Sequence, residues 1–151
     1  MEPTDVRKHT VESLKVAPIG SGGDFYRYFL ATHPEHRRFY KGAKSHTSED
    51  NLESERFDKL GDTILLFVHV LANTFDNESV FRAYVRKVTF KHIEETISPA
   101  LWKHFWEYWI GFLESKGPTL SAEEKFAWNI LGTMFNHECQ TFLAAMDRLH
   151  A

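Results

Sequence analysis

The sequence predicts an all-α fold, and three observations point to it. Apolar residues recur three and four positions apart through most of the 151 residues, as they do on the buried face of a helix. No segment shows the apolar–polar alternation of a strand, and no internal repeat appears. Five prolines divide the chain, because proline interrupts a helix interior. We therefore expect one domain over residues 1–151, with six to eight helices too uneven for a simple four-helix bundle.

The first third of the chain contains two predicted helices. Residues 5–15 form the first helix, and residues 22–32 form the second, which contains the aromatic run DFYRYFL. Pro34 then opens a short helical turn over PEHRRFY, because proline suits the first turn of a helix. The polar segment KGAKSHTSEDNLES that follows is expected to be mostly loop.

A long helix over about residues 53–73 comes next. Its apolar side chains keep helical spacing, so they are expected on one inner side. These side chains are Phe57, Leu60, Ile64, Phe67, Val68 and Leu71. Asp76 and Asn77 then mark a turn and a helix cap, and the helix that carries His92 follows.

The last two helices have clear start signals. Pro99 begins one helix, which ends near Gly117 because a Gly-Pro pair stops helices. Ser121 and Glu124 have the spacing of a capping box, in which each side chain bonds to the other residue's backbone N–H. The final helix runs to about residue 149.

The composition excludes several classes of function. The chain has 18 Lys and Arg against 21 Asp and Glu, a net charge of −3, so we expect no nucleic-acid surface. The longest apolar run, ILLFV at 64–68, is too short for a membrane span. One cysteine, Cys139, excludes an internal disulfide. The N-terminus lacks a secretory segment, so we expect a cytoplasmic protein. An aromatic content of 15% suits a dense core or a large flat ligand.

Two glycines lie where a helix disfavours them. Gly22 is near the start of the second helix, and Gly61 is inside the long helix. A glycine in a helix interior costs about 0.5–1 kcal/mol relative to alanine, and a close approach of two backbones is a common compensation. If the two helices cross at these glycines, Tyr26 and Leu60 come to one place.

His92 is a polar residue on an apolar helical stripe. Steps of four, seven and eleven residues back from it reach Val88, Val85 and Phe81. His92 is therefore either a core histidine bonded to a carbonyl group or a ligand of a metal or cofactor. His69 is expected to be structural, while His104 and His137 could face either core or solvent.

Together these features resemble a globin. The helix order, the two glycines, Pro34 and the position of His92 match that family, and nematode globins are the more similar group. The motifs that carry the resemblance are DFYRYF, RRFYKGA, RFDKLGDTILL and AYVRKVTFKH, and it extends over residues 5–149. No one motif is diagnostic, but their joint order and spacing are specific.

The resemblance implies a haem b cofactor and assigns roles to several residues. His92 is the expected proximal ligand of the haem iron, with the carbonyl of Val88 expected to accept its other ring N–H. Tyr26 falls at the position on the second helix that faces bound ligand. Leu60 falls at the distal position, and Ile64 lies one turn later, over the iron.

The chain departs from the family at two positions. Leu60 stands where many globins have histidine or glutamine, and leucine neither donates a hydrogen bond nor binds iron. The aromatic position stacked on the haem falls on Tyr40, where the family has phenylalanine, and a shift of one residue would place Phe39 there.

The implied function is reversible, high-affinity dioxygen binding, for storage or transport. The Tyr26 hydroxyl would stabilise the polarised ligand, and carbon monoxide, which is less polarised, would gain less. Nitric oxide is a further ligand. Alternatives are a haem enzyme, acting as a nitric oxide dioxygenase or weak peroxidase, and a haem-based gas or redox sensor. The aromatic run WKHFWEYW at 102–109 could be core or could partly serve a homodimer.

Overall fold

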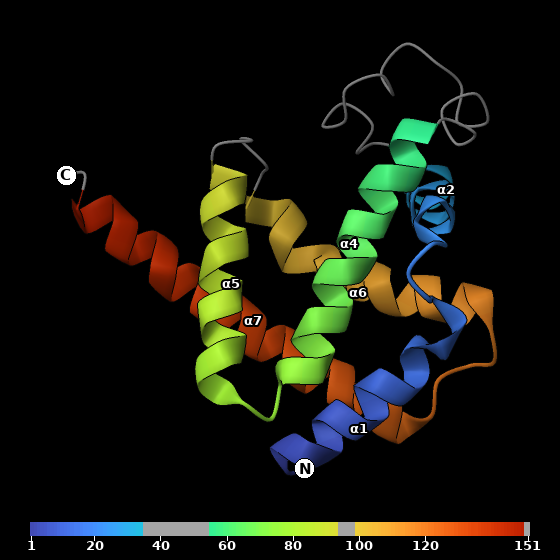
Figure 1. Cartoon of the computed structure of the whole chain (residues 1–151), viewed down its shortest axis with the longest axis horizontal. Helices are drawn as coiled ribbons and strands as arrows, with labels where there is room; N and C mark the ends of the chain where they lie inside the picture. The colour runs from blue at the N-terminus through green and yellow to red at the C-terminus, as the bar shows by residue number, and fades with distance from the viewer. Residues whose placement is uncertain (35–54, 94–98, 150–151) are drawn as a thin grey trace.

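The prediction of an all-α protein is confirmed by the computed structural model (Figure 1). The structure describes residues 1–34, 55–93 and 99–149, and for residues 55–57, 92–93, 99–103 and 149 it describes the backbone alone. Within these residues it contains six α-helices and no strand. The helices are α1 (Pro3–Ser13), α2 (Gly22–Thr32), α4 (Glu55–Thr74), α5 (Glu78–Ile93), α6 (Pro99–Lys116) and α7 (Ala122–Leu149), and a 3₁₀ turn, η1 (Leu14–Val16), follows α1.

The predicted capping box is present at the start of α7. The backbone N–H of Ser121 donates to Oε1 of Glu124, and the N–H of Glu124 donates to Oγ of Ser121, both at 3.0 Å. Each bond satisfies an amide that the helix itself leaves without a partner. Asn77 similarly caps α5, because its Oδ1 accepts the N–H of Val80 at 3.4 Å.

The first helix differs from its prediction by a small shift. It begins at Pro3 rather than residue 5, because proline in the first turn removes only an N–H that would have had no helical partner. It ends at Ser13, and the chain then tightens into the 3₁₀ turn η1. Leu14, in that turn, is 3% exposed, so this end of the segment still contributes to the core.

The run WKHFWEYW packs inward over its described part. Phe105, Trp106, Tyr108 and Trp109 are buried in, or packed against, the hydrophobic core, whereas His104 and Glu107 are exposed. Trp106 stacks against Trp128 of α7 at 6.1 Å between ring centroids. The apolar residues at 104–109 are therefore core residues, and the polar ones form the outer side of α6.

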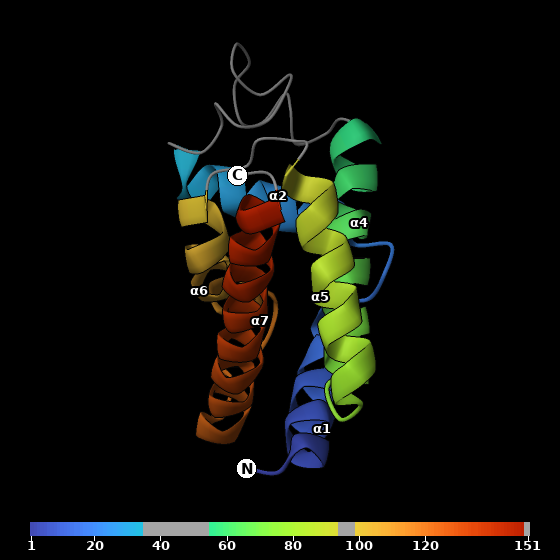
Figure 2. The same ribbon diagram turned by 90° about the vertical axis from the view of Figure 1, so that its left-hand side faces the viewer.

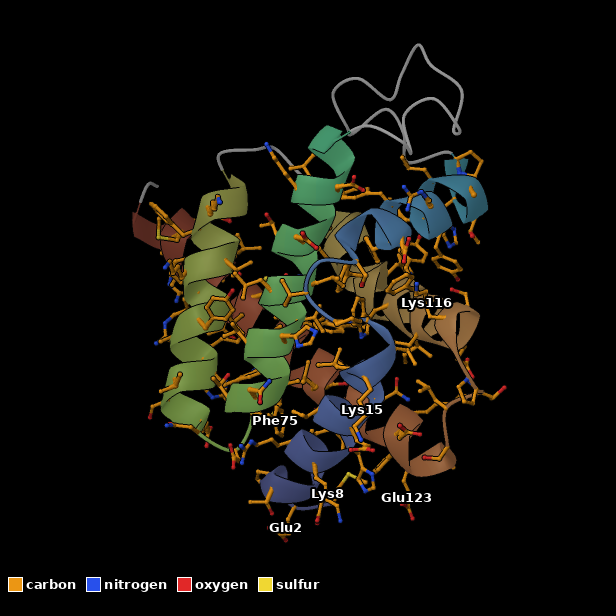
Figure 3. All side chains as sticks on the ribbon, turned by 45° about the vertical axis from the view of Figure 1, so that its right-hand side comes forward. Glu2, Lys8, Lys15, Phe75, Lys116 and Glu123 are labelled. Carbon is orange, nitrogen blue, oxygen red and sulfur yellow. The ribbon has the colours of Figure 1, made fainter. Side chains whose placement is uncertain are left out.

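The helices form two sides of the molecule. A 90° turn (Figure 2) shows α6 and α7 on one side and α1, α4 and α5 on the other. A short turn that contains Phe75 (labelled in Figure 3) joins α4 to α5, and the two helices diverge from it in Figure 1. Among the described helices, none has both the length and the hydropathy needed to cross a membrane.

Candidate functional site

The crossing of α2 and α4 is the closest helix contact of the site. A Cβ atom on Gly22 would overlap the backbone of Gly61 and Asp62, and one on Gly61 would overlap the backbone of Gly22. Only glycine at both positions allows the two backbones to approach this closely. The prediction that the second helix and the long helix cross at these glycines is therefore confirmed.

The crossing determines where Tyr26 lies. Tyr26 follows Gly22 by four residues, one helical turn, so it lies on the same side of α2 as the crossing. Its side chain is 3% exposed, and its ring meets that of Phe25 edge to face at 5.7 Å between centroids. Tyr26 is therefore a buried residue beside the crossing of α2 and α4.

One stripe of α4 is only partly covered by the rest of the protein. Leu60 is 37% exposed, and Ile64 and Phe67 are half-buried, whereas Leu65 and Val68 are fully buried. Leu60 therefore differs from the expected inner-side core residue. The reason is its place near the start of α4, before the turns that enter the core at Leu65 and Val68. The stripe therefore gives α4 apolar side chains that pack against the edge of the core and stay partly exposed.

A matching stripe runs along α5. Tyr84 and Val88 are half-buried, whereas Phe81 and Val85, on the adjacent face, are fully buried. Burial raises the pKa of the Tyr84 hydroxyl, so it is neutral and a hydrogen-bond donor at ordinary pH. The rings of Tyr84 and Phe67 lie 6.4 Å apart, and this contact joins the two stripes.

His92 continues the stripe of α5 by register. It follows Val88 by four residues and Tyr84 by eight, and its backbone belongs to α5. Eight residues of helix correspond to a rise of about 12 Å, so the backbone of His92 lies well beyond the Tyr84–Phe67 contact. The side chain of His92 lies outside the described residues, as do Tyr40 and Phe39 altogether, and their roles stay predictions.

Three other histidines are not brought to this site. His69 bonds through Nε2 to the carbonyl oxygen of Ala17 at 2.8 Å, and a carbonyl only accepts, so Nε2 carries the proton. Its predicted structural role is confirmed. His104 and His137 are both exposed. In the described part of the chain, no three His, Cys, Asp or Glu side chains cluster as a metal site would require.

The far side of α5 is fixed to α7. Glu138 of α7 accepts hydrogen bonds from Arg82 at 2.8 Å and from Arg86 at 2.7 Å. Thr89 donates to the carbonyl of Val85, and its oxygen also lies 2.9 Å from the sulfur of the buried Cys139. Burial raises the pKa of that thiol, so Cys139 is a neutral packing residue. These contacts hold the helix that carries His92.

The chain is similar to known proteins over most of its length. The Globin family model matches residues 23–139, most of the chain. The chain belongs to the globin family. A myoglobin of Nippostrongylus brasiliensis is 50% identical over 146 residues, covering 93% of this globin and 94% of that protein. A cuticular globin isoform from the same organism is 45% identical, over 100% of this chain and 91% of its own.

Solved structures agree with the fold. The globin-like protein GLB-1 of C. elegans is 40% identical, covers 97% of each chain, and superposes with a TM-score of 0.92. The predicted similarity to nematode globins is thus confirmed. Membership of this family implies a haem cofactor.

The described residues fit a haem group. Haem is a flat, mostly apolar molecule, and the stripes of α4 and α5 offer apolar side chains that pack against the core but stay partly exposed. The buried Tyr26 lies on α2 beside the crossing, and the backbone of His92 continues the register of the α5 stripe. The sequence analysis did not identify two residues of this region, Tyr84 and Asp62. Tyr84 could have been identified, because it precedes Val88 by four residues and His92 by eight and so shares their helical face. No local spacing pattern identifies Asp62, whose contacts are described below.

Proposed function

We propose that this globin is a single haem-binding domain, over residues 1–151, that reversibly binds dioxygen with high affinity for storage or transport. The observation that carries the proposal is the glycine crossing of α2 and α4. It brings the buried Tyr26 to the start of α4, where the apolar stripe begins with Leu60 and Ile64. This combination would place the Tyr26 hydroxyl, a hydrogen-bond donor, beside the apolar start of α4.

The cofactor of the proposal is haem b. His92 would hold it as the proximal iron ligand, and the carbonyl of Val88, one turn earlier, would accept the other ring N–H and so fix the tautomer. Tyr40 or Phe39 would stack on it. When bound, haem supplies a ferrous iron with one open position, which takes dioxygen, carbon monoxide or nitric oxide.

Tyr26 provides the preference for dioxygen. Dioxygen becomes polarised when it binds ferrous iron, and the Tyr26 hydroxyl would donate a hydrogen bond to it. A hydrogen bond to a charged or strongly polarised acceptor is worth about 1.5–3 kcal/mol, which is about ten- to more than hundredfold in affinity. Carbon monoxide is less polarised and gains less. Leu60 adds no second donor, so affinity for dioxygen rests on Tyr26.

The test is the rate of dioxygen release from the Tyr26→Phe variant of the haem-loaded protein. We expect release at least about tenfold faster than from the parent, because the ring is kept and only the hydroxyl is lost. Tyr28→Phe is the matched control, because Tyr28 is on the same helix but its hydroxyl lies against Gly111 of α6. Release from Tyr26→Phe within about twofold of the parent would contradict the proposal.

We prefer a carrier role to an enzyme or a sensor. Within the described residues, no specific feature favours nitric oxide dioxygenation, peroxidase activity or haem-based sensing. The cytoplasmic location and the homodimer also stay predictions. The compartment is not given by similarity, because the relatives in one nematode bear both the name myoglobin and the name cuticular globin isoform.

A further inference from the structure

The first turn of α2 receives its cap from another helix. Ser21 is the residue before α2, yet its side chain makes no cap bond, because its Oγ donates to the carbonyl of Pro18 at 2.7 Å. Instead, Oδ1 of Asp62, on α4, accepts the backbone N–H of Gly22 at 2.9 Å. The same oxygen accepts the N–H of Gly20, also at 2.9 Å.

This arrangement is favourable for two reasons. The first amides of a helix have no partner within the helix, and a carboxylate near them also interacts favourably with the helix dipole. Gly20 has a φ of +108°, a conformation that glycine adopts without steric cost, and this turn directs its N–H to the same oxygen as that of Gly22. One carboxylate oxygen thus holds the whole entry to α2.

The segment before α2 is attached to α4 at a second point. The carbonyl of Ala17 accepts the ring N–H of His69 at 2.8 Å. His69 and Asp62 are seven residues apart, which is two turns of α4, so they lie on one side of that helix. The segment between Ala17 and Gly22 is therefore bound along α4. The hydrogen bonds of His69 and Asp62 fix the position along α4 at which α2 begins.

These contacts also determine the position of Tyr26. Asp62 bonds to Gly22, Gly22 contacts Gly61, and Tyr26 lies one helical turn after Gly22. A rotation or slide of α2 at its first turn would move the Tyr26 hydroxyl relative to the stripe of α4. The glycine contact alone prevents a clash but contributes no directional bond, whereas the hydrogen bonds of Asp62 are directional.

We infer that Asp62 is a positioning residue for ligand binding, which holds α2 so that the Tyr26 hydroxyl reaches the ligand. The inference rests on the proposed function, because it assumes that Tyr26 donates to dioxygen. In this role Asp62 would act through α2, without contact to the ligand or the haem. Its loss is expected to weaken the hydrogen bond that Tyr26 makes, while the tyrosine itself is still present.

The experiment compares Asp62→Ala with Asp62→Asn in the haem-loaded protein. We expect Asp62→Ala to release dioxygen at least about threefold faster, and to move the C–O stretching frequency of the carbon monoxide complex toward that of Tyr26→Phe. Asparagine retains an oxygen acceptor, so Asp62→Asn should restore most of both properties. Asp58→Ala is the matched control, because Asp58 is one turn earlier on α4, its side chain is 52% exposed, and its ion pair to Arg27 is long, at 4.0 Å.

The double variant Asp62→Ala/Tyr26→Phe separates positioning from general loosening. If Asp62 acts through Tyr26, the double variant should release dioxygen at the rate of Tyr26→Phe. Additive effects, or an Asp62→Ala release rate equal to the parent's, would overturn the inference while leaving the proposed function intact. If Tyr26→Phe itself leaves the release rate unchanged, the proposed function and the inference both fail.

A second measurement, which needs no ligand, shows directly whether the contacts of Asp62 are lost in a variant. Amide hydrogen exchange of Gly20 and Gly22 reports the two bonds to Asp62 directly. If Asp62→Ala does not fold, Asp62→Leu, which is close in size and has no acceptor, is measured by exchange and by dioxygen release together, beside Asp62→Asn. Protection at both amides should weaken and release should quicken in Asp62→Leu but not in Asp62→Asn, and weaker protection with an unchanged release rate would overturn the inference.

Discussion

At the residue scale, leucine at position 60 predicts the coordination state of the proposed haem. If the pocket is as proposed, a histidine at this position could supply a second iron ligand, whereas leucine has no ligand atom. We therefore expect the reduced, ligand-free protein to show a five-coordinate, high-spin visible spectrum. Leu60→His should shift it toward six-coordinate, low-spin. Leu66→His is the control, because Leu66 is 53% exposed on a different face of α4. A low-spin spectrum in the parent would contradict the prediction.

Single residues also show which contacts can be predicted from the sequence and which cannot. The place of Tyr26 one turn after Gly22, beside Gly61, follows from spacing along a helix, whereas its proposed role came from the resemblance to globins. Asp62 was not identified, because its bonds join residues 40 and 42 positions apart, and no local pattern encodes such a contact. An aspartate inside a predicted helix looks like a solvated residue until the second helix is placed beside it.

At the scale of elements, the glycine crossing predicts unequal costs for adding a methyl group. Alanine at any of these sites gains up to about 1 kcal/mol of helix propensity relative to glycine. In Gly61→Ala the added Cβ overlaps the backbone of Gly22, which cannot move without displacing α2. We expect the free energy of unfolding to fall by about 1–3 kcal/mol, as for an overpacked core. Urea denaturation measures it.

Gly23→Ala is the matched control for that prediction. The added Cβ would meet only the end of the Asp58 side chain, which is exposed and can rotate away. We expect the free energy of unfolding of Gly23→Ala to stay within about 1 kcal/mol of the parent's. If Gly61→Ala is as stable as Gly23→Ala, the two helices do not depend on the glycine contact.

The prediction of whole elements succeeded where local chemistry determines them. The capping box at Ser121 and the proline at Pro99 set helix starts without help from distant residues. The first helix was shifted by two residues, since helix ends depend on weak preferences. The partly covered stripe of α4 could not be predicted, because the exposed fraction of Leu60 depends on how the other helices pack.

At the scale of the whole molecule, two carboxylates join helices that are distant in sequence. Asp24 of α2 accepts a hydrogen bond from Lys116 of α6 (labelled in Figure 3). This bond holds the pKa of Asp24 below its usual 3.8. Burial opposes the shift, and the positive charges of Lys116 and Arg27 add to it. Burial raises the pKa of Glu138, but the hydrogen bonds and charges of Arg86 and Arg82 outweigh it, so that pKa lies below 4.5.

These shifts predict that acid weakens the fold. Each carboxyl group has a lower pKa when folded than when unfolded, so its stabilisation is complete above the unfolded pKa and is lost as the pH falls through the folded one. We expect the free energy of unfolding to change little between pH 7 and 5 from these groups, and to decrease below about pH 4.5, first through Glu138. Urea denaturation at a series of pH values measures this, with the haem content kept constant.

Glu138→Gln isolates the contribution of Glu138 to that effect. The Glu138 side chain is 11% exposed, but Arg82 and Arg86 are 29% and 44% exposed, so solvent reduces the value of the ion pairs. We expect a loss of about 1–2 kcal/mol at pH 7 and a flatter acid limb, so that parent and variant converge as Glu138 becomes protonated. Glu123→Gln is the control, because that side chain is 74% exposed. Parallel pH curves for parent and Glu138→Gln would show that this carboxylate does not link α5 to α7 energetically.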